Sequence, residues 1–148
     1  NYYLITGFGA AFLHYLIIHF QISDLESYFT SNQISEIVNS GAFNPSSPLF
    51  SKARMLYGLH HTPVVGASGA VFGLLLAYGM TYPNQIIYLN LLFPIKAKYF
   101  VIIYGLLEFV MGVQNSAGDN VAHFAHIGGM LFGFLLIKYW KKNDMNFY

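Results

Sequence analysis

The chain has 148 residues, about the length of one domain. Only 9% of them are Asp, Glu, Lys or Arg, whereas soluble domains carry roughly 25%; 55% are hydrophobic and the net charge is +1. So few charges cannot cover a soluble protein of this size, and the composition also excludes a disordered chain and a basic nucleic-acid-binding protein. The absence of cysteine excludes a disulfide scaffold and a thiolate zinc site. These observations predict a membrane protein.

Long stretches with few or no charges divide the chain. A membrane-spanning helix needs about 20 mostly apolar residues. The stretches predict four such helices, at about 2–20, 64–82, 98–115 and 120–139. β-Barrel strands are disfavoured because the stretches are too long and do not alternate polar with apolar residues. The predicted fold class is therefore all-α, a polytopic transmembrane helix bundle.

The connections between these stretches suggest the topology. Residues 21–63 are expected to form a long loop, in which 22–38 can carry a short interfacial helix. Pro83 is expected to end the second span and Pro94 to open the third helix. Of the seven Lys and Arg residues, five lie in or beside the 83–97 loop and in the C-terminal region, and two lie in the 21–63 loop. The positive-inside rule then predicts a cytoplasmic C-terminus and an outer 21–63 loop.

Ser68 lies at the outer start of the second predicted helix, between Gly66 and Gly69 in V-V-G-A-S-G-A-V-F-G. A serine hydroxyl becomes a good nucleophile when a base takes its proton, and a helix start supplies backbone N–H groups that stabilise an oxyanion. The alternative interpretation is structural. Small residues at the G-x-x-x-G spacing of Gly69 and Gly73 usually mark close helix packing.

The last predicted helix carries two histidines in V-A-H-F-A-H-I-G-G-M-L-F-G, residues 121–133. Ionisable groups within spans are rare and functional by default. His126, Gly129 and Gly133 fall on one face of a helix, where glycines let a partner helix approach closely. This arrangement predicts a serine–histidine pair formed with Ser68. His123 is the competing candidate, which we interpret as a more exposed histidine near the rim.

These residues resemble the rhomboid intramembrane serine proteases. G-A-S-G at 66–69 is similar to the G-x-S-G motif of that family, and A-H-I-G-G-M-L-F-G at 125–133 is similar to its A-H-x-x-G-x-x-x-G motif. The resemblance implies that Ser68 is the nucleophile, that His126 is the general base and that the Phe72 ring packs against the histidine. It also implies transmembrane protein substrates in a lipid bilayer, with no nucleic acid and no metal or other cofactor.

The chain departs from the family in one respect. The second helix of rhomboid proteases carries an H-x-x-x-N pair that helps to bind the oxyanion, but here none of the six histidines is followed by asparagine four residues on. Asn1 is also not an initiator. We therefore expect 1–148 to be a single rhomboid-like domain that is N-terminally incomplete, with 1–20 resembling the third core helix. A chain that lacks two helices is not expected to be active alone.

Glu108 stands alone in an apolar stretch. It can orient a histidine as a triad acid does, but we favour a bundle-facing carboxyl that can be protonated. The sequence thus predicts a Ser–His endopeptidase that cleaves transmembrane substrates, in a multi-pass protein of a bacterial cytoplasmic membrane. Two alternatives are an inactive rhomboid-like protein that binds membrane clients, and a small transporter subunit with Glu108 and the histidines as a proton path.

Overall fold

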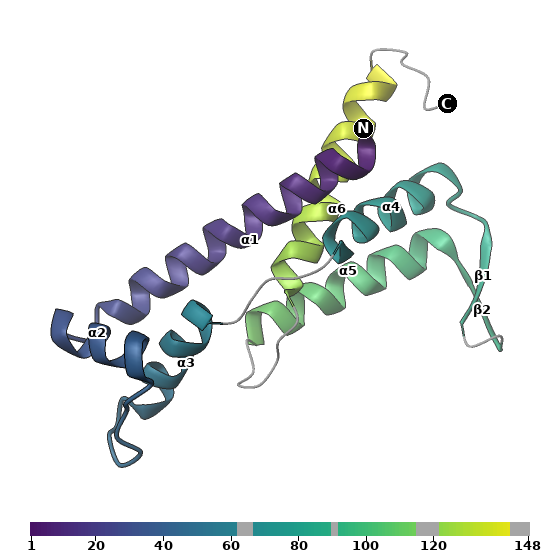
Figure 1. Ribbon diagram of the computed structural model, residues 1–148. Helices are drawn as coiled ribbons and strands as arrows, with labels where there is room; N and C mark the ends of the chain where they lie inside the picture. The colour runs from purple at the N-terminus through teal and green to yellow at the C-terminus, as the bar shows by residue number, and fades with distance from the viewer. Residues whose placement is uncertain (62–66, 90–91, 115–121, 143–148) are drawn as a thin grey trace. The chain divides into compact units, whose positions relative to one another are not determined.

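The computed structural model describes residues 1–61, 67–89, 92–114 and 122–142, which form helices and one hairpin (Figure 1). The elements in chain order are α1 (Tyr2–Glu26), α2 (Ser31–Ser40), α3 (Phe50–His61), α4 (Ser68–Thr81), β1 (Ile86–Leu89), β2 (Phe93–Lys96), α5 (Ala97–Gln114) and α6 (His123–Lys142). They belong to two compact units. The bundle unit contains the start of α1 together with α4, the hairpin, α5 and α6, and the α2–α3 unit contains the end of α1 with α2 and α3.

The four predicted spans correspond to α1, α4, α5 and α6, but within the described ranges only α1 and α5 are long and apolar enough to cross a membrane. Helix α4 has 14 residues, so it extends about 21 Å, which is less than a hydrocarbon core of about 30 Å. Helix α6 has 20 residues, but two histidines, three glycines and three lysines lower its hydropathy. The expectation of four spanning helices is therefore supported for two.

The bundle unit is held together by close helix contacts at glycines. Helix α6 packs against both α4 and α5. A Cβ added to Gly129 of α6 would overlap the carbonyl oxygen of Gly69 in α4, and one added to Gly133 would lie 3.4 Å from the Cα of Gly73. The start of α1 joins the same interface, because the Tyr2 hydroxyl donates to the Gly73 carbonyl at 2.8 Å. The backbones of α4 and α6 therefore meet almost without intervening side chains.

The 83–97 connection contains an antiparallel hairpin, which leaves α4 and leads into α5 (Figure 1). Ile86 lies opposite Lys96 and Tyr88 opposite Pro94. The expectation that Pro94 opens the third helix is wrong, since that helix begins at Ala97. Proline lacks a backbone N–H, but in a two-stranded hairpin each strand is an edge strand that tolerates this loss.

The α2–α3 unit corrects the prediction that 21–63 is a long loop. Helix α1 continues to Glu26, and two further helices follow, of which α2 only partly overlaps the predicted interfacial helix. Helix α2 begins with a capping box between Thr30 and Gln33 and ends at Gly41, which has a φ of 64°. The unit has an apolar core of its own. Its buried members are Leu25, Ile37, Ala53 and Leu56.

Candidate active site

Ser68 is the first residue of α4, and its side chain is exposed. The first helical hydrogen bond at this end runs from the Val71 N–H to the Ala67 carbonyl, 3.1 Å. The N–H groups of 68–70 therefore precede the helical hydrogen-bond ladder, and no side chain caps this end of the helix. Ser68 therefore lies beside backbone N–H groups that the helix itself does not use.

His126 lies in the first turn of α6, directly opposite Ser68. Its Nε2 is 2.9 Å from the Ser68 Oγ, although the two residues are 58 positions apart in the chain. The serine is exposed, whereas His126 is only 7% exposed. The close approach of Gly69 and Gly129, one and three residues from these side chains, allows the short distance. The structure thus brings together the two residues that the motifs single out.

Phe72 lies one turn after Ser68 and stacks on the His126 ring. The ring centroids are 4.0 Å apart and the planes differ by 9°. Because the Phe72 ring covers a face of the imidazole, both nitrogen atoms at the ring edge stay available for hydrogen bonds. The stacked contact also restricts tilting of the imidazole plane. Phe72 therefore fixes the plane in which the Nε2 atom points toward the serine.

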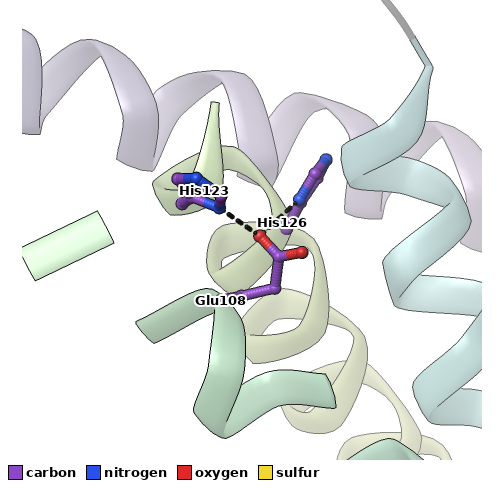
Figure 2. A group of neighbouring side chains, drawn as sticks. All are labelled: Glu108, His123 and His126. Carbon is purple, nitrogen blue, oxygen red and sulfur yellow. Dashed lines mark hydrogen bonds and ion pairs between the residues drawn. The ribbon is translucent and has the colours of Figure 1, made fainter. Parts of the chain in front are cut away.

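Glu108 of α5 binds the opposite edge of the same imidazole. Its Oε2 lies 2.8 Å from Nδ1 of His126 and 2.7 Å from Nδ1 of His123, and Figure 2 shows both rings converging on that oxygen. Glu108, His123 and His126 are 6%, 7% and 7% exposed. Where the carboxylate is ionised, its Oε2 accepts a hydrogen bond from an Nδ1–H of each histidine. The lone pair on Nε2 of His126 then faces the serine hydroxyl.

These contacts change the interpretation of two polar residues. The expectation that His123 is an exposed histidine near the rim is wrong, because its side chain is buried against Glu108. Glu108 faces the bundle as expected, but it binds two histidines. The sequence carries a signal that Glu108 faces a neighbouring helix. The buried residues of α5 recur on one helix face with Glu108 among small neighbours, and they are Ala97, Val101, Glu108 and Gly112.

The same three side chains have the composition of a metal site. One ligand atom from each of Glu108, His123 and His126 lies within 4.8 Å of the others. Around a tetrahedral zinc with bonds of about 2.0 Å, neighbouring ligand atoms stand about 3.3 Å apart. The Nδ1–Oε2 separations of 2.7 and 2.8 Å are shorter and have hydrogen-bond length. The geometry therefore favours a hydrogen-bonded cluster.

Three of the remaining predicted site residues lie at close helix contacts. Gly69, Gly129 and Gly133 lie in the α4–α6 contact described above, where each lacks room for a side chain. Gly66, like the ends of several predicted spans, lies outside the described residues. Thr6, in the part of α1 that belongs to the bundle unit, is fully buried against Gly73. A Cβ added to Gly73 would lie 2.7 Å from the Cβ of Thr6.

Comparison with known proteins gives the family. The family model described as "Rhomboid domain" matches residues 2–142, so the chain belongs to the rhomboid family, whose members are membrane proteins. An uncharacterized rhomboid protein of Schizosaccharomyces pombe, named as mitochondrial, is 29% identical over 109 residues. That alignment covers 69% of this chain and 28% of the relative, so the chain spans less than a third of the relative's length. No solved structure matches the chain.

The family assignment confirms the membrane location that the composition predicts. The name of the yeast relative places that protein in mitochondria, whereas the sequence led us to expect a bacterial cytoplasmic membrane. The comparisons therefore support a membrane location but do not support a bacterial origin.

Proposed function

We propose that the chain forms the catalytic part of an intramembrane serine endopeptidase, with Ser68 as nucleophile and His126 as general base. One observation carries this proposal. The Ser68 Oγ lies 2.9 Å from Nε2 of His126, which is the distance at which a base takes a hydroxyl proton. Membership of the rhomboid family and the two motifs that contain these residues support the same conclusion.

The proposed reaction is acyl transfer in two steps. The Ser68 Oγ attacks the scissile carbonyl carbon while its proton passes to Nε2 of His126, and the carbonyl oxygen becomes an oxyanion. His126 then gives the proton to the leaving amine as the C–N bond breaks, which leaves an acyl-serine. Water attacks this ester, its proton passes through His126 to the Ser68 Oγ, and the acid product is released. Every proton is returned, so the enzyme is regenerated.

The start of α4 supplies the electrostatic part of the proposed site. The backbone N–H groups of 68–70 precede the helical hydrogen bonds, and we propose that they stabilise the charge that develops on the carbonyl oxygen. A helix of about 21 Å cannot span the bilayer, so it can hold Ser68 below the membrane surface. Segments of transmembrane proteins are therefore the proposed substrates.

The extent of the domain and its topology in the membrane are also proposed. Residues 1–148 are proposed to act as one rhomboid-like domain of a multi-pass protein whose C-terminus is cytoplasmic. The basic residues near the end of α6 support this orientation, because cations collect on the cytoplasmic side.

The decisive experiment is cleavage of a model transmembrane substrate in liposomes by the full-length protein. Ser68→Ala removes the nucleophile and is expected to lower kcat by at least about 10³-fold. Ser35→Ala is the matched control, since Ser35 is an exposed serine of α2 that hydrogen-bonds Asn39. A fluorophosphonate probe should label the wild type and the control but not Ser68→Ala. Equal cleavage by wild type and Ser68→Ala would falsify the proposal.

A further inference from the structure

We propose that Glu108 is a positioning residue of this site and that His123 holds its carboxylate, so that Ser68 and His126 work as part of a Glu–His–Ser triad. The inference rests on the proposed function and extends the serine–histidine pair expected from the sequence. It is carried by two buried histidines of α6 that converge on one carboxylate oxygen of buried Glu108 in α5 (Figure 2).

The geometry suits an ionised carboxylate. Its Oε2 can accept an N–H from each histidine, at 2.7 and 2.8 Å. Two such donors compensate much of the cost of burying the charge, which a site only 6% exposed would otherwise impose.

A carboxylate in this position acts on catalysis in two ways. It keeps the proton of neutral His126 on Nδ1, so that Nε2 presents its lone pair to the Ser68 Oγ at 2.9 Å. It also supplies a negative charge beside the imidazolium that forms when His126 takes the serine proton. Both effects concern the reacting histidine and not the bound substrate, so they act on kcat.

His123 holds the carboxylate in place from one turn before His126 on the same helix. The two rings are nearly perpendicular, at 88°, with centroids 6.4 Å apart, so both Nδ1 atoms reach one oxygen without the rings colliding. Gly112, one turn after Glu108, makes room for this arrangement. A Cβ there would lie 3.2 Å from the Cβ of His123. The cluster thus depends on a close contact between α5 and α6.

The test compares Glu108→Gln with Glu108→Asp in the full-length protein. The glutamine keeps the size of the side chain but removes the charge, so we expect kcat to fall by roughly 10²–10⁴-fold with KM within about twofold of wild type. The aspartate restores the charge on a shorter side chain and should be at least about tenfold more active than the glutamine. His123→Gln removes one donor to the carboxylate and is expected to cost about tenfold in kcat.

Two further readouts separate positioning from folding. Nitrogen-15 NMR should find the His126 proton on Nδ1 in wild type and distributed over both ring nitrogens in Glu108→Gln. Thr6→Val is the control for loss of a buried polar group, because Thr6 is fully buried and its hydroxyl bonds backbone carbonyls of its own helix. It should lower the melting temperature and leave kcat unchanged.

The outcomes distinguish this inference from the proposed function. If Ser68→Ala is inactive while Glu108→Gln keeps the wild-type kcat, the positioning role is overturned and the protease assignment stands. If Ser68→Ala remains active, the proposed function itself fails. Loss of wild-type cleavage on chelation, with recovery on adding Zn²⁺ alone, would identify the cluster as a metal site and overturn the triad.

Discussion

The two units of the molecule pack their helices in different ways. In the bundle unit, α4 and α6 meet at Gly69 and Gly129, where the backbones touch and no side chain fits. In the α2–α3 unit, the interior is filled by side chains such as Leu25, Ile37 and Leu56. Backbone contact leaves little freedom to shift, whereas side chains can repack around a change. The tighter unit is the one that brings a serine and a histidine to 2.9 Å.

Each unit also contains a histidine stacked on an aromatic ring, and these two contacts differ in their surroundings. Phe72 and His126 have centroids 4.0 Å apart, and Tyr57 and His61 have centroids 4.2 Å apart. His126 is bonded to the side chains of Ser68 and Glu108, whereas Nδ1 of exposed His61 lies 2.9 Å from the carbonyl of Tyr57 in its own helix. Stacking alone therefore does not make a reactive site; the partners at both ring edges do.

Among the changes that test this contrast between the units, Gly129→Ala is expected to lower kcat/KM most. The new Cβ would overlap the Gly69 carbonyl, so α4 and α6 must separate and Ser68 must move away from His126. A displacement of about 1 Å at a reacting centre costs on the order of 10²-fold, and we expect at least that loss in kcat/KM.

The matched control for this change is Gly58→Ala in α3, where an added Cβ would meet nothing within 4 Å. Alanine favours the helix by about 1 kcal/mol over glycine, so the α2–α3 unit should gain thermal stability with no change in cleavage. Similar losses of activity in both variants would show that the contrast between the units is false.

A smaller loss of kcat/KM is expected for Phe72→Leu, which removes the stacked ring and keeps an apolar side chain. Aromatic stacking contributes about 0.5–1.5 kcal/mol beyond burial, which corresponds to about a 2- to 12-fold loss in kcat/KM if the contact orients His126. Tyr57→Leu removes the corresponding ring in the α2–α3 unit and should lower thermal stability while kcat/KM stays at the wild-type value. Unchanged kcat/KM in Phe72→Leu would mean that the ring does not orient His126.

The sequence predicted those parts of the fold that composition or local motifs determine. Helices α1, α4, α5 and α6 correspond to the four long stretches with few or no charges. Helix α2 is predicted only in part, by the short helix expected over 22–38, and α3 is not predicted because its segment is neither long and apolar nor clearly amphipathic. Nevertheless, the capping pattern from Thr30 to Gln33 and the glycine after α2 could have indicated a helix. The hairpin is not predicted because a proline after a short apolar stretch also fits the first turn of a helix.

The candidate site was predictable only in part, for a related reason. Ser68, Phe72 and His126 stand in local motifs. The pairing of Glu108 with His123 instead depends on how α5 and α6 cross, and spacing within one helix does not specify that crossing. The small residues around Glu108 on its helix face indicate that it faces a partner, but they do not identify which side chain it meets.

The smallest loss of kcat is expected for Gly112→Ala, at the α5–α6 contact that holds His123. This variant tests whether the carboxylate cluster depends on close packing. In Gly112→Ala the new Cβ would lie 3.2 Å from the Cβ of His123, so the histidine must shift by a few tenths of an ångström and its bond to Glu108 weakens. Loss of part of one hydrogen bond predicts a two- to fivefold lower kcat. Gly105→Ala is the control, because its nearest neighbour is the flexible end of Met130. Since the effect passes through the carboxylate, Gly112→Ala should cost nothing further in a Glu108→Gln background, and an additive loss there would place its action elsewhere.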